Sequence, residues 1–242
     1  MLKILRDAWV IGRIHAYPTQ REPVAYFVFV VVFPLAMLAF ARGVQPEGSS
    51  LDNRLIAGSM VFSLGISTVN SLAQTLLMER FNHQLQMLVV SPVHRLSYAL
   101  GALGFGALRG TGGVLIVLLA APLLGFDVQL SPWLLPIALL TAASMAGLSL
   151  VIGTWSPDFT TGNLMAQVVG ILIVMLSPVY FSLSRLPDWL QWPARFSPYT
   201  HATDAIQGAI SGSTPFGAVA VLAALTAVTI SLGIAGMRWR DI

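Results

Sequence analysis

"LIAGSMVFSLGISTVNSLAQTLLM", residues 55–78, contains no charged side chain. A helix needs about 20 consecutive apolar residues to cross the hydrocarbon of a bilayer. The stretch is long enough, and it lacks the strict alternation of apolar and polar residues that is typical of a half-buried strand. A helix also satisfies its own backbone hydrogen bonds inside a bilayer. Residues 55–78 therefore predict a transmembrane helix and, with it, a membrane protein.

The composition of the whole chain agrees with this prediction. Of the 242 residues, 56% are hydrophobic and 10% are charged, and the mean hydropathy is +0.78. An ordinary soluble domain has about 25% charged residues. We predict an all-α, polytopic membrane protein with one transmembrane domain over residues 1–242. Its six spans are expected at about 24–41, 55–78, 97–126, 133–154, 164–183 and 216–237.

Arg109 leaves two alternatives for the third span. An arginine at mid-bilayer costs about 2.5 to 3.5 kcal/mol on insertion scales. The hydrocarbon span can begin near Gly110, with Arg109 reaching back to the cytoplasmic interface along its aliphatic stem. Alternatively, a longer helix begins near Ser97 and Arg109 faces the protein interior. The sequence leaves both alternatives open.

The segment before the first span, residues 1–23, is basic and carries Lys3, Arg6 and Arg13. A secretory signal peptide has an apolar region of roughly 7 to 15 residues. The apolar run that follows residue 23 is longer than that, and the leader before it is long. We therefore expect residues 1–23 to form an amphipathic segment in the cytoplasm.

The distribution of basic residues predicts the orientation of the chain. Under a six-span topology, nine of the 13 basic residues fall on the side of the termini: Lys3, Arg6, Arg13, Arg21, Arg80, Arg95, Arg109, Arg238 and Arg240. The other side has four: Arg42, Arg54, Arg185 and Arg195. The positive-inside rule then places both termini in the cytoplasm. The net charge of +3 follows from this topology and implies no nucleic-acid partner.

"ERFNHQLQMLVVSPVHR", residues 79–95, is a polar interruption between two apolar runs. At helical spacing Phe81, Leu85, Leu88 and Val89 fall on one face. The residue before Pro92 is pushed out of the α region, so the helix should end near residue 90. Such a helix either lies on the lipid headgroups and links two spans, or docks into a groove of a partner protein.

These residues resemble a family signature. The pattern Glu79-Arg80, Gln86-x-Leu88 and Ser91-Pro92-Val93-x-Arg95 is similar to the stretch after the second span of ABC-2 type permeases, the membrane subunits of ATP-binding-cassette exporters. The chain length, the six spans and "FSPYTHATDAIQG" before the last span agree with that family. The resemblance implies a bacterial inner-membrane exporter subunit, a homodimer in contact with membrane lipid, and a cytoplasmic ATPase partner. The residues that it implies for ATPase coupling are Glu79, Arg80, Phe81, Leu85, Leu88, Val89, Ser91, Pro92 and Arg95.

The energy source has to lie outside this chain if transport is driven by ATP. The only lysine is Lys3, so no phosphate-binding loop of the form G-x-x-x-x-G-K-[ST] is present. We therefore expect no enzymatic activity and no cofactor on this chain, with ATP and Mg²⁺ bound by the partner. No acidic residue lies deep in a predicted span, which argues against an ion-coupled carrier. A carrier or channel that works without ATP remains the alternative, followed by a membrane scaffold without transport.

Small and polar residues on the second span offer a candidate path. Serines recur every fourth position from residue 59 to residue 71, and Ser67, Asn70 and Gln74 lie close to one face. Small residues at this spacing let helices pack closely in lipid. The residues either pack within one subunit or line a path for an amphiphilic cargo, such as a drug, a lipid or a lipid-linked saccharide.

The connection before the last span, residues 185–212, should hold short re-entrant or interfacial helices. Trp189 and Trp192 favour the headgroup level, and Ser197-Pro198 is typical of a helix start. His201 and Asp204 are too few for a metal site. The chain has no cysteine, so disulfides and thiolate metal sites are excluded.

Overall fold

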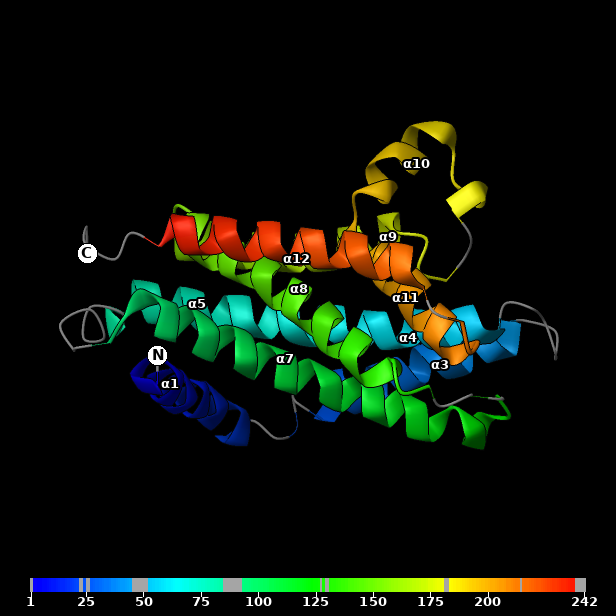
Figure 1. Cartoon of the computed structure of the whole chain (residues 1–242), viewed down its shortest axis with the longest axis horizontal. Coiled ribbons are helices and arrows are strands. Elements are labelled where there is room, and N and C mark those ends of the chain that lie inside the picture. The colour runs from blue at the N-terminus through cyan, green and yellow to red at the C-terminus, as the bar shows by residue number, and fades with distance from the viewer. Residues whose placement is uncertain are drawn as a thin grey trace.

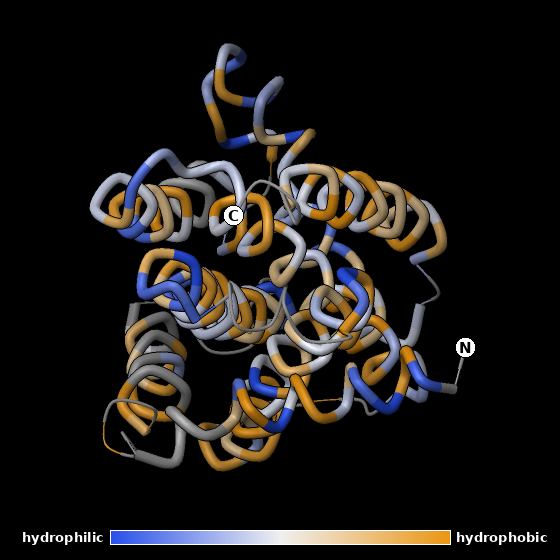
Figure 2. The backbone as a smooth tube through the Cα atoms, turned by 90° about the vertical axis from the view of Figure 1, so that its left-hand side faces the viewer, coloured by the Kyte–Doolittle hydropathy of each residue, from blue (hydrophilic) through white to orange (hydrophobic). Residues whose placement is uncertain are grey.

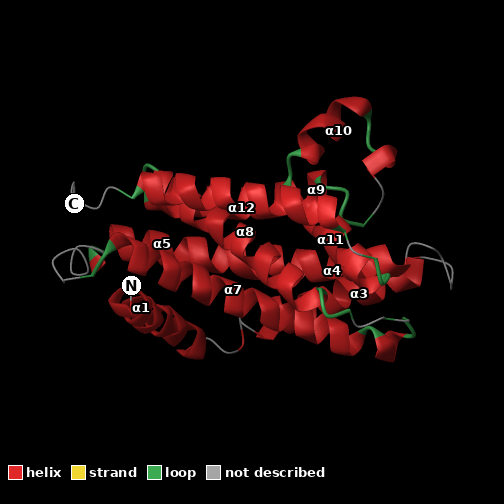
Figure 3. Ribbon diagram, viewed as in Figure 1, coloured by secondary structure: helices red, strands yellow, loops and turns green. Residues whose placement is uncertain are grey.

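Secondary structure in the described part of the chain is helical throughout, without strands (Figure 3). The structure, a computed structural model, describes residues 2–21, 24, 27–44, 52–84, 93–126, 128, 131–180, 183–213 and 215–237. The α-helices are α1 (Leu2–Arg21), α3 (Phe33–Val44), α4 (Asp52–Gly65), α5 (Ser71–Phe81), α7 (Arg95–Ala120), α8 (Leu134–Trp155), α9 (Phe159–Leu176), α10 (Asp188–Arg195), α11 (Pro198–Ile210) and α12 (Phe216–Gly236). Two π-helices, η1 (Val28–Val32) and η2 (Ile66–Asn70), and two 3₁₀ turns, η3 (Pro122–Leu124) and η4 (Leu183–Arg185), complete the described elements.

The centre of the bundle is one unbroken helix, Asn53–Phe81, made of α4, η2 and α5. Helices α7, α8, α9 and α11 pack around it (Figure 1). Its small residues permit the close packing that drives helix association in lipid. A Cβ built on Gly58 would lie 2.7 Å from the carbonyl oxygen of Val179, and one on Gly65 would overlap the ring of Tyr199.

Four helices among the described residues are long and apolar enough to cross a membrane: Asn53–Phe81, Arg95–Leu124, Leu134–Trp155 and Phe216–Gly236. They coincide with the second, third, fourth and sixth predicted spans. The third begins at Arg95 and continues without a break past Arg109, which is half-buried in its middle. The helix itself is therefore the longer one, and the depth of Arg109 in the membrane stays a prediction.

The first and fifth predicted spans stay predictions. The first, 24–41, coincides with η1 and α3 as far as its residues are described, and α3 continues to Val44. The fifth, 164–183, coincides with α9, which begins five residues earlier at Phe159 and ends at Leu176. Both helices lie beside the central helix, so they are placed as spans of the same bundle would be.

The two described ends of the chain lie at the same end of the bundle (Figure 1). Seen from that end, the long helices are viewed nearly along their axes, and α1 lies at the side of the bundle (Figure 2). Helix α1 packs along the first half of α7. The termini, the end of α5 and the start of α7 therefore share one face, as the predicted orientation requires.

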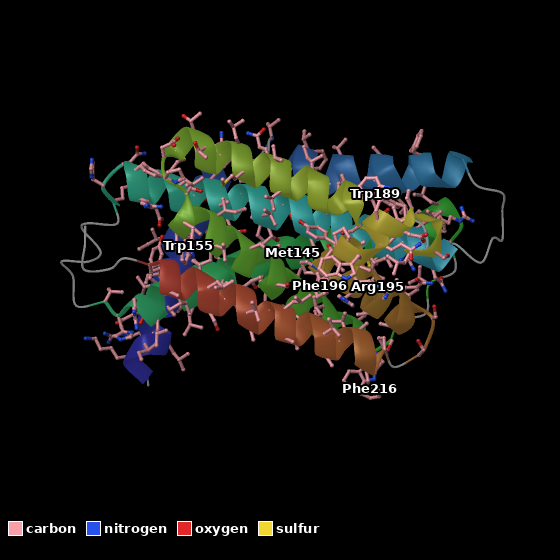
Figure 4. The ribbon with its side chains drawn as sticks, turned by 90° about the horizontal axis from the view of Figure 1, so that it is seen from above. Met145, Trp155, Trp189, Arg195, Phe196 and Phe216 are labelled. Carbon is pink, nitrogen blue, oxygen red and sulfur yellow. The ribbon has the colours of Figure 1, made fainter. Side chains whose placement is uncertain are left out.

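The opposite end carries the short helices α10 and α11, which confirms helices before the last span. Figure 4 shows Trp155 at one end and Trp189, Arg195 and Phe196 gathered near the other. Trp189 is 74% exposed. Ser197 caps α11 by accepting a hydrogen bond from the backbone N–H of Tyr199 at 3.3 Å, with Pro198 in the first turn. The depth of α10 and α11 in the membrane stays a prediction.

Candidate functional site

The last turn of the central helix places Glu79 inside the protein. Its side chain belongs to α5, and the residue is only 8% exposed. The phenol of Tyr98, on α7, donates to Oε2 at 2.6 Å. The imidazole Nε2 of His15, on α1, lies 3.0 Å from Oε1 and 3.2 Å from Oε2. One carboxylate thus joins the ends of three helices.

His15 is held in this cluster by aromatic and backbone packing. It is 2% exposed, its ring stacks on Phe105 at 6.1 Å between centroids, and it meets the edge of Tyr98 at 5.8 Å. Two turns earlier, α1 runs so close to α7 that a Cβ on Gly101 would lie 2.6 Å from the carbonyl oxygen of Ala8. The position of His15 is therefore fixed by the contact between α1 and α7.

Arg80 points to another neighbour, the C-terminal end of α8. Its Nη1 donates to the carbonyl oxygens of Gly153 at 3.2 Å, Thr154 at 2.9 Å and Ser156 at 2.8 Å. Carbonyls at a helix C-terminus lack helical partners and carry partial negative charge, so a cation is stabilising there. The guanidinium also lies over the ring of Phe81, 5.0 Å from its centroid. Glu79 and Arg80 together connect the end of α5 to α1, α7 and α8.

The prediction of one continuous helix over residues 79–90 is wrong, because the helix is interrupted after Phe81. Helix α5 ends at Phe81, and a turn follows at Asn82 and His83. His83 has a φ of 61°, in the left-handed region that a helix cannot contain. Phe81 therefore does not continue in one helical face to Leu85.

The other residues predicted for ATPase coupling divide into two groups. Arg95 is exposed at the first turn of α7, where His94 caps the helix by accepting from the N–H of Leu96 at 3.2 Å. The remaining residues lie outside the described part of the chain: Leu85, Leu88, Val89, Ser91 and Pro92. Their predicted role stays a prediction.

The predicted path residues face α9. Gln74 donates from Nε2 to Oδ1 of Asn163 at 3.1 Å, and a Cβ on Gly170 would lie 3.3 Å from Oδ1 of Asn70. Ser67 is buried and donates to the backbone carbonyl of Ser63, so it packs within the central helix. Asn70 and Gln74 thus form a polar, uncharged strip with α9.

The π-helix η2 lies beside this strip. A π-turn widens the helix and leaves carbonyls less well paired, and such turns are frequent at functional sites. Here Ser149 of α8 lies 3.3 Å from the carbonyl oxygen of Thr68 and 3.4 Å from that of Val69. The irregular turn is therefore supported by a neighbouring helix.

The end of the central helix opposite Glu79 holds a second buried charge, Arg54, which sequence reasoning counted only for topology. Its Nη1 lies 3.2 Å from Oδ1 of Asp204 and 3.1 Å from Oε1 of Gln207. Its Nη2 donates to the carbonyl oxygen of Pro178 at 2.6 Å. Asp204 is thus an ion-pair partner. Among the described residues, no group of three or more metal-ligating side chains occurs.

His15 and Tyr98 were also missed as site residues. One signal was present for His15, because Ala8, Ile11 and His15 are spaced three and four residues apart and so share a face of the N-terminal helix. A histidine on an apolar face has to find a buried partner. Its partner lies 64 residues away, so spacing gives no indication of which residue it is.

Comparison with known families gives one match. The family described as ABC-2 type transporter matches residues 17–211, well over half of the chain. A search among curated proteins finds no match. The matched range contains the central helix, the 79–95 segment and helices α10 and α11, so the sequence resemblance is confirmed. The chain belongs to the ABC-2 type transporter family, and it is the membrane component of an ABC transporter.

Proposed function

We propose that the chain is the six-span membrane subunit of an ATP-driven exporter in the bacterial cytoplasmic membrane, with both termini in the cytoplasm. The observation that carries the proposal is the family match over residues 17–211. The chain has only one lysine, Lys3, and therefore has no phosphate-binding loop of its own. ATP and Mg²⁺ are then bound by a separate ATPase chain. The family resemblance further supports a homodimer of the permease.

The proposed ATPase-binding face is the end of the bundle that contains the start of α1, the end of α5, the start of α7 and the end of α12 (Figure 1). Exposed basic side chains gather there, among them Arg6, Arg13 and Arg95. Because Glu79 and Arg80 are both engaged inside the protein, we assign the direct contact to Phe81, to Arg95 and to the 85–92 residues between them. This assignment removes Glu79 and Arg80 from the residues that the sequence suggested for direct contact with the ATPase.

The proposed cargo is an amphiphile that enters from the membrane. Asn70, Gln74, Asn163 and Gln167 offer amide groups without formal charge along η2, α5 and α9. Such groups can hydrogen-bond a polar headgroup, while apolar side chains accommodate acyl chains. The exposed apolar side chains of α9, such as Val168, support contact with lipid or with the second subunit.

The experiment that tests the ATPase partner is co-purification. A tagged permease is solubilised gently from its native host and the bound proteins are identified by mass spectrometry. We expect a stoichiometric ATPase with a phosphate-binding loop, and its loss on Phe81→Asp combined with Arg95→Glu. Arg185→Glu is the matched control, because Arg185 is exposed at the opposite end of the bundle. A permease that is recovered without any ATPase contradicts the proposal.

A second experiment tests energy source and direction. The purified complex is reconstituted with a fluorescent short-chain phospholipid, and ATP is added on the side of the ATPase. Export predicts that the probe becomes protected from an external quencher only with hydrolysable ATP. Movement that ignores ATP and collapses with an ion gradient would instead support the carrier alternative.

A further inference from the structure

The His15–Glu79–Tyr98 cluster occupies a distinctive place in the chain. Glu79 is the residue at which the 79–95 segment begins, and Tyr98 follows that segment by three residues. The 2.6 Å hydrogen bond between them therefore ties the two ends of the segment to each other. His15 adds α1 to the same carboxylate. A displacement of the 79–95 segment therefore acts directly on the hydrogen bonds of this cluster.

The carboxylate of Glu79 is engaged within the chain through both of its oxygens. An ionised carboxylate only accepts hydrogen bonds, so Tyr98 and the Nε2–H of His15 are the donors. Both oxygens have a donor within 3.2 Å. With 8% exposure, the group has little surface left for a partner protein. Its charge acts inside the permease and not across an interface.

Helix α1 is positioned to move with this junction. Its other contact is the tight packing of Ala8 and Ile11 on Gly101 of α7. The opposite face of α1 is exposed, including Trp9 at 69%. Among the described residues, His15 provides the polar connection from α1 to the central helix. His15 lies outside the residues that match the family, so this connection adds to what the family match covers.

We infer that His15 and Tyr98 are positioning residues for energy coupling: they hold Glu79 so that α1 and the start of α7 follow the 79–95 segment when the ATPase displaces it. The inference rests on the proposed function. It assigns to His15 and Tyr98 the alignment of this junction, through a buried carboxylate whose observed contacts lie within the chain.

The test uses the complex of the permease with its ATPase in lipid nanodiscs. Because the chain has no cysteine, two introduced thiols are the only sites for spin labels on the permease, which is labelled before the ATPase is added. Val10→Cys reports α1 and Thr160→Cys reports the bundle, since both residues are exposed. Distances between the labels are measured without nucleotide and after trapping with ATP and vanadate. We expect a nucleotide-dependent shift in this parent pair.

The variants separate positioning from folding. Tyr98→Phe removes one hydroxyl and keeps the ring, and His15→Leu removes the imidazole donor. We expect both variants to lose the nucleotide-dependent change in label distance while the ATPase stays bound. His15→Gln should retain this change, because its amide N–H can still donate to Glu79. Tyr199→Phe is the control: it removes a buried phenol hydroxyl that has no hydrogen bond among the described residues.

The outcomes are distinguishable. A shift of equal size in the parent, Tyr98→Phe and His15→Leu overturns the inference, as does a parent complex that hydrolyses ATP without any shift. If His15→Leu does not fold, the result for Tyr98→Phe alone decides whether the inference holds. A parent permease that binds no ATPase contradicts the proposed function itself, and this is seen at purification before any distance is measured.

Discussion

Arg54 and Glu79 stand at opposite ends of the same unbroken helix, and both charged side chains are buried against other elements. At 1.5 Å per residue they lie about 37 Å apart along the helix axis. Arg54 joins α11, and Glu79 joins α1 and α7. The central helix is therefore anchored by a charge at each end, and its middle is held by packing and neutral hydrogen bonds.

Replacing Arg54 should destabilise the outer end. Arg54→Ala leaves Asp204 and the Pro178 carbonyl without this donor. Removing one partner of a buried pair costs about 3 to 5 kcal/mol, and because Asp204 is 44% exposed we expect about 2 kcal/mol. Thermal unfolding in detergent measures the loss. Arg195→Ala, at an exposed position, is the control, and an equal effect of both variants would contradict the anchoring role.

Arg80→Ala should loosen the end of α8. Three carbonyls lose a charged donor, and a hydrogen bond to a charged group contributes about 1.5 to 3 kcal/mol. We expect a lower unfolding temperature and faster hydrogen exchange in the last turn of α8, near residue 155. Arg95→Ala, exposed at the same end, should leave that exchange unchanged. Unchanged exchange in Arg80→Ala would show that the capping contributes nothing.

Gly101→Ala should separate α1 from α7. The added methyl would lie 2.6 Å from the carbonyl oxygen of Ala8 and 2.8 Å from the Cβ of Ile11, so the helices have to move apart. Overpacking of this kind costs about 1 to 3 kcal/mol. Gly104→Ala is a matched control on the same helix, because nothing lies within 4 Å of its added methyl. Thermal unfolding should separate the two variants, and equal stability would argue against tight packing of α1.

Gln74→Leu should impair transport more than stability. The bond from Gln74 to Asn163 crosses between two membrane helices, where such bonds average about 0.6 kcal/mol. We therefore expect an almost unchanged unfolding temperature. If the amide also binds the cargo headgroup, loss of about 1 kcal/mol lowers transport of the fluorescent phospholipid about fivefold. If Gln74→Leu transports the phospholipid at the wild-type rate, Gln74 does not line the cargo path.

Asp158 should make the start of α9 sensitive to acid. The N–H and hydroxyl of Thr161 donate to its carboxylate at 2.8 Å each, and these bonds hold the pKa of Asp158 below its ordinary value. A lowered pKa contributes stability above the unfolded value of about 3.9, and that stability is lost as the pH falls through the folded pKa. Protection of the first turn of α9 against hydrogen exchange, relative to the intrinsic exchange rate at each pH, should therefore fall below pH 4.

The variant Asp158→Asn tests the sign of this effect. Asparagine still caps a helix but does not titrate in this range. Its exchange rates should therefore show no corresponding acid transition. An acid transition of the same size in both proteins would mean that another group is responsible.

Most helices could be predicted because the signals for them are local. Uncharged runs of about 20 residues predicted four of the observed long helices within a few residues. Ser197 and Pro198 marked the start of α11 as observed. The break at His83 was not predictable in this way, because the apolar spacing through residues 81–89 continued across a turn that only the observed φ reveals.

The sequence by itself determined the membrane class, the family signature and the uncharged strip on the second span, since each depends on composition or on spacing within one segment. Only the tertiary structure decided what the charges do. Glu79 and Arg80 are adjacent in sequence, yet one reaches His15, 64 residues earlier, and the other reaches Gly153, 73 residues later. A buried charge is stabilised by whichever partners the packing of helices brings within about 3 Å, and that distance is a property of the folded bundle, not of any single helix.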